Sequence, residues 1–521
     1  MAEVAAPREI ETKYAVERSF TVPPLAAAVP GIAAVDEPRT VELTASYYDT
    51  ADLRLARDGI TLRRRTGGDD AGWHLKLPDP KDADVRFEIG APLGAAETGQ
   101  DLVVPESLTD LVAVHLRGEL LRSVGEVRTT RAVRVLRNDA GDPVAELMDD
   151  EVRAETTYGT VVQGTSFREL ELELGAGTDR RLAREVAKVL AAAGAEPRAL
   201  VPKLVRALGA QAQQPPEVPR PLDRVDHAGP ARDLVEADVR AHVRAIMAYD
   251  PLVRRDEPDS VHKMRVSVRR LRSTLRTFGS LLDAAVLEPL EGELTWLADV
   301  LGEPRDREVM LDRLRGELAV LPVEQALGPV SARFDAELYG GLLRAREAAL
   351  TALRGERYRA LVDSLVGFAA QVPTTTAAAE PADAVLRALV RRSWRSLARR
   401  VQAAVAADPQ HDELYHRARK AAKRTRYAAE ACIPAYGSAA AELATRVAAV
   451  QDALGEHQDS VIARELLRTL AVHANAANEN AYTYGLLAGR ERCAAHTSLT
   501  EFSSVWRGAS RRRYRRWLAD R

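Results

Sequence analysis

The sequence is poor in cysteine and in aromatic residues. Its 521 residues include two cysteines, Cys432 and Cys493, which form no CxxC pattern. They give no basis for a disulfide framework, and a reducing compartment is the better expectation. Aromatic residues make up 5% of the chain. Nucleic acid is therefore a disfavoured partner, because proteins hold single strands largely by stacking bases on aromatic rings.

The sequence also lacks long apolar runs. No apolar stretch approaches the length that is needed to span a bilayer. The N-terminal segment has acidic residues where a signal peptide would have its apolar core. We therefore expect a cytoplasmic protein without a membrane-spanning segment.

One stretch divides the chain into two parts that differ in the period of their apolar residues. Residues 209–230 are rich in Pro and Gln and show no apolar period, which predicts a semi-rigid linker. After it, Ala, Leu and Arg recur with a helical period, interrupted at 372–383. The predicted organisation is a first domain at 5–208, a linker at 209–229 and a helical domain at 230–518, with halves at about 230–372 and 383–518.

Charge is distributed unevenly between these parts. From Pro230 onward there are 45 Lys and Arg against 38 Asp and Glu, a net charge of +7. The remainder holds 29 basic and 38 acidic residues, a net charge of −9, within a total of −2. An acidic front and a basic back predict different tasks for the two parts.

The segment "VHKMRVSVRRLRSTLRTF" at 261–278 predicts a helix with two stripes. The apolar stripe consists of Val261, Met264, Val268, Leu271 and Leu275. The adjacent basic stripe consists of His262, Arg265, Arg269, Arg272 and Arg276. It is roughly 21 Å long and has no acid along the helix to offset its repulsion. A plain basic surface helix remains open, but the pattern favours a track for a polyanion.

The same stripe recurs in the second half of the helical part, in "LYHRARKAAKRTRYAAE" at 414–430. An offset of 154 aligns the two histidines and three of the basic positions, and the last position differs because Arg276 meets Glu430. "LGEPRDREV" at 301–309 is likewise echoed by "LGEHQDSVI" at 454–462. The repeat predicts duplicated helical halves that face each other.

These motifs resemble the CHAD domain, an all-helical module with a histidine in each half that binds inorganic polyphosphate. Arg suits such a ligand because its planar fork bonds two phosphate oxygens at once. Each histidine is either a phosphate donor or a core residue satisfied by the backbone. The expected polyphosphate-binding residues are His262, Lys263, Arg265, Arg269, Arg270, Arg272, Arg276, His416, Arg417, Arg419, Lys420, Lys423, Arg424 and Arg426.

The first part of the chain changes to a period of two, which is typical of strands. Eight segments predict strands: 8–16, 59–66, 72–78, 84–90, 127–136, 144–152, 158–165 and 166–174. Two helices are expected around 107–122 and 179–194. This many strands in this length indicate an antiparallel barrel or sandwich.

Charged residues alternate with apolar ones in several of these segments. In "EIETK" (9–13), three charged residues share one face, and in "ELELE" (169–173) three acids do. The charged faces therefore either all point to water or all line one interior. Three acids on one strand face repel one another unless a cation binds.

The segments "EIETK", "SYYDTADLRLARDGITLRRR" and "FRELELEL" resemble the CYTH superfamily, or triphosphate tunnel metalloenzymes. The resemblance covers about 5–208 and implies an eight-stranded antiparallel tunnel with charged walls. The whole chain is then a multidomain α+β protein. Members hydrolyse or rearrange inorganic triphosphate, thiamine triphosphate, RNA 5′-triphosphates or ATP.

The resemblance also implies roles for residues. Mg²⁺ or Mn²⁺ would be held by carboxylates, which are the hard oxygen ligands these ions prefer: Glu9, Glu11, Asp150, Glu169, Glu171 and Glu173. Triphosphate would be held by basic side chains: Lys13, Arg63, Arg65, Lys76, Arg86, Arg131 and Lys203. The family usually ends with a Ser-Lys pair, whereas Pro202 precedes Lys203 here, which leaves the role of Lys203 open.

Three functions follow from these expectations. The first is a metal-dependent inorganic triphosphatase whose helical domain binds polyphosphate and associates with polyphosphate granules. The second is a slow or non-catalytic polyphosphate-binding protein. The third, ranked last, is class IV adenylate cyclase or thiamine-triphosphatase activity. The sequence leaves the oligomeric state and any coupling between the domains open.

Overall fold

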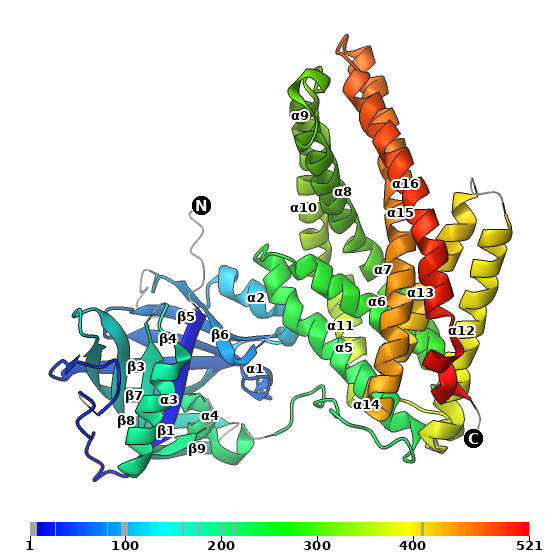
Figure 1. Cartoon of the computed structure of the whole chain (residues 1–521). Coiled ribbons are helices and arrows are strands. Elements are labelled where there is room, and N and C mark those ends of the chain that lie inside the picture. Colours follow the sequence, from blue (N-terminus) through cyan, green and yellow to red (C-terminus); the bar gives the residue numbers. More distant parts are fainter. Residues whose placement is uncertain are drawn as a thin grey trace. The chain divides into compact units, whose positions relative to one another are not determined.

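The computed structural model of this chain describes residues 8–519 except 27, 81, 95–102, 159–160, 176, 199–201, 213 and 408–410. The chain forms two compact units, 1–217 and 218–521, coloured from blue to green and from green to red in Figure 1. The boundary between them lies within the predicted linker.

The first unit is built on an antiparallel sheet in the order β10-β1-β6-β5-β4-β3-β7-β8-β9, with β2 paired to β7. Its strands are β1 (Arg8–Ala15), β2 (Ala34–Val35), β3 (Arg39–Asp49), β4 (Thr61–Thr66), β5 (Gly72–Asp79), β6 (Asp82–Ala91), β7 (Arg122–Arg137), β8 (Pro143–Tyr158), β9 (Val161–Leu174) and β10 (Glu196–Arg198). Strand β1 pairs with β6 at its start and with β9 from Glu11 onward.

The sheet has ten strands rather than the eight predicted, so the eight-stranded barrel is not confirmed. The predicted segment 166–174 and the described residues of 158–165 from Val161 onward form one strand, β9, and Tyr158 is the last residue of β8. Strand β3 was not among the predicted strands, although its end carries the Tyr-Tyr-Asp of the segment that resembles the CYTH superfamily. Strands β2 and β10 have two and three residues and are too short to show alternation.

Alternation along the strands places apolar side chains on the outer face of the sheet. Tyr14, Leu170 and Leu172 pack there against helix α3 (Arg180–Ala192), which contributes Val186 and Leu190. Helix α2 (Glu106–Leu116) ends well before residue 122, because Arg117 and Gly118 take positive φ angles. Both helices lie at the predicted places but are shorter.

Helix α4 (Lys203–Leu208) packs against the other face of the sheet. The charged residues lie on this same face, at other positions along the strands. Leu204 and Leu208 of α4 contact a cluster that includes Val127 and Val152. Because Lys203 is the first residue of α4, this packing carries its side chain among the charged residues. The short helix α1 (Arg54–Arg57) completes the unit.

The second unit is helical. Its α-helices are α5 (Ala231–Arg254), α6 (Ser260–Phe278), α7 (Ala284–Val300), α8 (Gly302–Ala319), α9 (Val330–Arg333), α10 (Gly340–Arg354), α11 (Glu356–Ala370), α12 (Ala382–Ala406), α13 (Asp412–Ala431), α14 (Ile433–Tyr436), α15 (Ser438–Ala476) and α16 (Tyr482–Ala509). Among the described residues, no helix has the length and apolarity of a membrane span.

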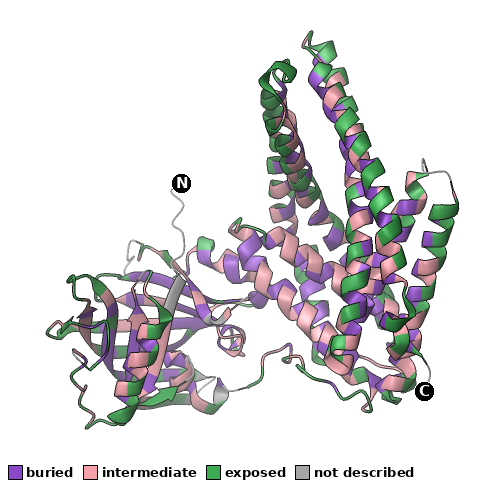
Figure 2. Ribbon diagram, in the orientation of Figure 1, coloured by how far each residue is buried: buried purple, intermediate pink, exposed green. Residues whose placement is uncertain are grey.

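The two basic segments form α6 and α13, which contact each other within this unit. On α6 the predicted apolar stripe is the buried face (Figure 2): Met264, Val268, Leu271 and Leu275 are fully buried, and Val261 is partly buried. The predicted linker makes more contacts with the helical unit than a semi-rigid linker was expected to make. Val218 and Val225 are buried, and Arg244 and Pro434 of the helical unit bond the backbone there.

Candidate functional site

The charged face of the sheet lines a cavity of about 120 Å³ in the first unit. Ten predicted site residues line it: Glu11, Lys13, Arg63, Arg65, Lys76, Arg86, Arg131, Glu171, Glu173 and Lys203. They come from β1, β4, β5, β6, β7, β9 and α4. The alternating charges therefore face one interior, which was the second of the two interpretations.

Three buried carboxylates surround the ammonium group of Lys203, which lines this cavity. Nζ of Lys203 lies 2.8 Å from Asp150, 3.1 Å from Glu169 and 2.6 Å from Glu171. Burial acts to lower the pKa of Lys203, but the three acids outweigh it and raise that pKa above its usual value. We call Glu11, Asp150, Glu169, Glu171 and Glu173 the acidic wall; Glu11, Glu171 and Glu173 line the cavity, and Asp150 and Glu169 contact Lys203.

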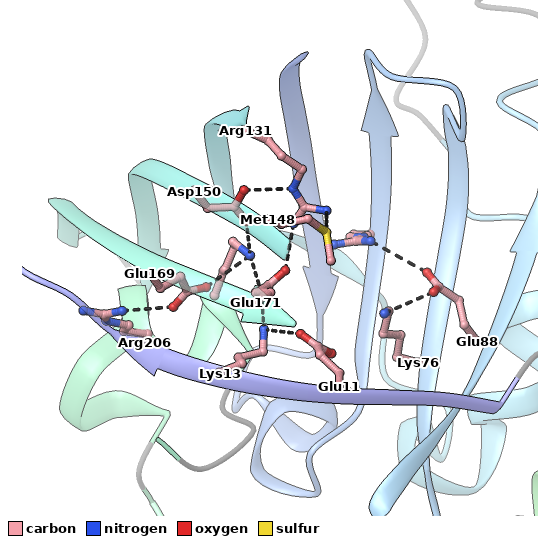
Figure 3. A network of polar contacts seen from close by, with 12 residues as sticks. Glu11, Lys13, Lys76, Glu88, Arg131, Met148, Asp150, Glu169, Glu171 and Arg206 are labelled. Carbon is pink, nitrogen blue, oxygen red and sulfur yellow. Dashed lines mark hydrogen bonds and ion pairs between the residues drawn. The ribbon is translucent and has the colours of Figure 1, made fainter. Parts of the chain in front are cut away.

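Two further cations engage the acidic wall (Figure 3). Arg131 donates to both oxygens of Asp150, at 2.8 and 2.7 Å, and to Glu171 at 2.8 Å. Lys13 donates to Glu171 and lies 3.0 Å from Glu11. Burial acts to raise the pKa of Glu171, but Lys13, Lys203 and Arg131 together hold it well below the usual value. Glu173 differs, because burial raises its pKa.

The opposite wall is dominated by cations, and we call Arg63, Arg65, Lys76 and Arg86 the basic wall. The Nε–H groups of Arg63 and Arg65 are buried and have no hydrogen-bond partner in the part of the chain that the structure describes. Burial and the neighbouring Arg63 lower the pKa of Arg65 to about 10. Arg65 pairs with Asp70, and Arg63 lies 3.7 Å from Glu88. The Nε–H donors that stay unsatisfied on both arginines favour an anionic ligand at this wall.

The sequence did not single out Glu88 or Arg206, which form charged contacts in or beside the cavity. Glu88 accepts from His74 at 2.9 Å and lies 3.1 Å from Lys76. Its signal was its shared strand face with Arg86. Arg206 donates to Glu169 at 2.9 Å and lies one helical turn after Lys203. The side chain of Glu9 lies outside the described residues.

The acidic wall has the donor chemistry for a divalent metal, since carboxylate oxygens suit Mg²⁺ and Mn²⁺. Among the described residues, however, no three His, Cys, Asp or Glu side chains are arranged to hold a metal ion. The Lys203 ammonium lies instead within ion-pair distance of Asp150, Glu169 and Glu171. For these three acids to bind a metal ion, the Lys203 ammonium group has to move away from them, or the acids have to contact the metal and the ammonium group together.

In the second unit, the basic stripes of α6 and α13 show matching contacts. Arg265 pairs with Asp306 at 2.8 Å, and Arg419 lies 3.8 Å from Asp459. Each of these arginines crosses the glycine of a Leu-Gly-Glu motif, and a Cβ at Gly302 or Gly455 would lie 3.4 Å from a guanidinium nitrogen. The repeated glycines therefore leave room for the repeated arginines.

The two stripes converge on Lys423. Burial and the positive charges of Arg269, Arg419 and Arg265 lower the pKa of Lys423 to about 7. The Nε–H groups of Arg265 and Arg419 are buried and lack a hydrogen-bond partner within the described ranges. We call Arg265, Arg269, Arg419 and Lys423 the central cation cluster, because the charges of the three arginines act on Lys423 across the two helices.

The remaining predicted residues of the stripes divide into two groups. Several have partners that the stripe alone did not reveal: Lys263 with Asp259, Arg417 with Glu413, Arg270 and Arg426 with Glu430, Arg272 with Thr295 and Arg276 with Glu291. His416 bonds Gln458 at 2.7 Å, and Arg305 adds to burial in lowering the pKa of His262. Lys420 is exposed, and Arg424 has a lowered pKa because of burial and then the charge of Arg400.

Comparison with known proteins identifies both units. The CYTH domain family matches residues 7–201, and the CHAD domain family matches residues 237–468. "Uncharacterized protein Rv2226" of Mycobacterium tuberculosis (strain ATCC 25618 / H37Rv) is 37% identical over 513 residues, which cover 94% of each chain.

Solved structures resemble parts of the chain. PptA from Streptomyces chartreusis is 26% identical, with a TM-score of 0.45, over 53% of this chain and 99% of that one. The CHAD domain from the plant Ricinus communis is 24% identical, with a TM-score of 0.45, over 56% of this chain and 95% of that one. The two family matches and the relative that is 37% identical over 94% of the chain show that the chain belongs to the family in which a CYTH domain is followed by a CHAD domain.

Proposed function

We propose that the CYTH domain hydrolyses inorganic triphosphate with Mg²⁺ or Mn²⁺, and that the CHAD domain binds inorganic polyphosphate. The observation that carries the first half is the division of one cavity into an acidic and a basic wall, with unpartnered donors on Arg63 and Arg65. CYTH domains are typically triphosphate hydrolases or cyclases, and such a cavity suits a metal–triphosphate complex.

The basic wall would bind the phosphate oxygens along a linear triphosphate. Charge-assisted hydrogen bonds from guanidinium and ammonium groups are the strong contacts available for this. Lys13 and Arg131 reach from the acidic wall toward the same cavity, so they complete the clamp. Positioning and charge stabilisation supply most of the catalysis of phosphoryl transfer, so no protein nucleophile is needed.

The metal would be held by Glu9 together with the acidic wall, that is, Glu11, Asp150, Glu169, Glu171 and Glu173. A bound divalent cation supplies neutralisation of phosphate charge and a lowered pKa for water. A carboxylate of this wall would orient the water that attacks the terminal phosphorus. Lys203 would keep the three acids around it together until a metal and an anion bind.

The central cation cluster supports the second half of the proposal. A chain of phosphates placed between α6 and α13 would satisfy the buried Nε–H groups of Arg265 and Arg419. It would also relieve the repulsion that lowers the pKa of Lys423. The protein would then hold long chains in one domain and cleave short ones in the other.

Substrate preference tests the catalytic half of the proposal. A cavity enclosed by charged walls accepts a short linear ligand along its length, whereas a nucleoside has to protrude. We therefore expect a higher kcat/KM for tripolyphosphate than for ATP, measured by orthophosphate release with Mg²⁺ or Mn²⁺. Equal or faster turnover of ATP, and above all cyclic AMP among the products, would move the assignment to a cyclase.

The pH dependence of polyphosphate binding tests the second half. A bound polyanion favours the protonated form of Lys423, whose pKa in the free protein is about 7. Above that pH, binding has to take up a proton, so affinity falls as pH rises. For one such group the fall is roughly twentyfold between pH 6.5 and 8.5.

The matched control is Lys423→Arg, which keeps the charge at all pH values in this range. Titration calorimetry of long-chain polyphosphate should then show nearly constant affinity across the same window. The histidines of the stripes contribute little there, because His262 and His416 have pKa values lowered by burial. An unchanged pH profile in the variant would contradict the role given to Lys423.

A further inference from the structure

A second cavity lies in the helical unit. It is separate from α6, and its side chains differ from those of the two basic stripes. It is a groove of about 840 Å³ along α15 and α16, which lie next to each other in Figure 1. This volume is within the range of about 300–1,000 Å³ that is typical of small-molecule sites. No residue of the two basic stripes lines it.

The middle of the groove carries two pairs of basic side chains. Arg464 and Arg468 are one helical turn apart on α15, and Arg492 and His496 are one turn apart on α16. Because the two helices are joined by the short connection 477–481, they run antiparallel and present these pairs to the same groove. Within the described ranges, none of the three arginines has an ion-pair or hydrogen-bond partner.

The two ends of the groove differ. At one end Asp412 accepts from His457 at 3.0 Å, so a negative charge closes that end against an anion. The other end is lined by small residues that include Ala471, Gly485 and Gly489. A Cβ built on either glycine would meet no atom within 4 Å, so this end is open space.

We propose that this groove binds a phosphorylated small ligand with an apolar body, of the size of a nucleotide. The paired basic residues supply donors for two phosphate groups, since Arg bonds phosphate oxygens through two parallel N–H groups. The acidic end directs the uncharged body toward the small-residue end. A phosphate chain without such a body would use the basic pairs and leave that end empty.

The chain offers a reporter for this groove that does not respond to the CYTH cavity. Cys493 is exposed and follows Arg492, whereas Cys432 is buried. An environment-sensitive maleimide dye on Cys493 of the full chain therefore reports binding beside the groove. The probes are ADP, which carries phosphates and a body, and pyrophosphate, which carries phosphates alone.

Two variants separate the two parts of the site. Arg468→Glu with Arg492→Glu reverses an exposed pair that has no ion-pair or hydrogen-bond partner among the described residues, and it should weaken both probes by roughly tenfold or more. Gly489→Leu fills the open end on a helix that tolerates Leu well, and it should weaken ADP while leaving pyrophosphate unchanged. The matched control, Arg399→Glu with Arg507→Glu, alters exposed arginines of α12 and α16 outside the groove and should change neither.

The expected result in the unaltered chain is a dye response to ADP at a concentration at least tenfold lower than to pyrophosphate. Equal responses to the two probes would overturn the proposal by making the groove a site for phosphate alone. So would a response that survives charge reversal in variants whose circular dichroism shows intact helices. A chain that fails to cleave tripolyphosphate but passes this test would leave the groove proposal standing.

Discussion

Replacing Glu9 and Glu11 together by Gln should reduce orthophosphate release from tripolyphosphate by roughly a thousandfold or more. A single electrostatic contact to a developing charge is already worth about 10²–10³ in rate, and this variant removes Glu11 of the acidic wall and Glu9, the second carboxylate of β1 that is expected to hold the metal. Glu11 lines the cavity and lies 3.0 Å from Lys13. Gln preserves the size of both side chains, so the fold should persist.

The matched control is Glu151→Gln with Glu155→Gln, which removes two charges from the exposed face of β8. It should retain turnover close to that of the unaltered chain. Polyphosphate binding should be the same in both double variants, because the CHAD domain is a separate unit. Turnover that survives the loss of Glu9 and Glu11 would exclude this cavity as the active site.

Reversing the charge of Arg265 and Arg269 to Glu should weaken polyphosphate binding at least tenfold. Charge-assisted bonds of partly buried groups are worth about 1.5–3 kcal/mol each, and the variant adds repulsion to the loss. Arg419→Glu with Lys423→Glu should have the same effect, because these residues share the central cation cluster. Helical content should not change, since Met264, Val268 and Leu271 form the buried face.

The unaltered chain provides the reference for this experiment. Its affinity for long-chain polyphosphate should fall log-linearly with salt, because binding releases counterions from the polyanion. The loss in the variants should be larger for long chains than for tripolyphosphate, which occupies part of a track roughly 21 Å long. Arg399→Glu with Arg507→Glu is the control, because it makes the same change of charge at exposed arginines outside both stripes. Undiminished binding in both cluster variants would make the stripes an ordinary solvated surface.

The sequence predicted the positions of the strands better than the contacts between residues that lie far apart in the chain. A period of two located most of the long strands and their charged face, since each residue's side depends only on its parity. It missed β3, whose end carries the Tyr-Tyr-Asp segment, and it divided β9 at a point where the pattern weakens. The short strands β2 and β10 have no periodicity to detect.

Charge patterns identified the basic stripes, but not the acids that approach them. Asp306 and Glu430 come from other helices or from beyond the stripe, and no local period reports such a contact. The position of Lys203 among three carboxylates was equally invisible, because it depends on how α4 packs. Long-range packing therefore decided the partners of Arg265 and Lys203, whereas Lys263, Arg417 and Arg426 pair with acids four residues away in the sequence.

The central claim is that the cavity between the acidic and basic walls cleaves triphosphate with a divalent metal. Orthophosphate release from tripolyphosphate by the full chain, with Mg²⁺, with Mn²⁺ and with EDTA, tests it most directly. The account predicts sustained release with at least one of the two metals and none with EDTA. Equal release in EDTA, or no release with either metal while polyphosphate still binds, would contradict it.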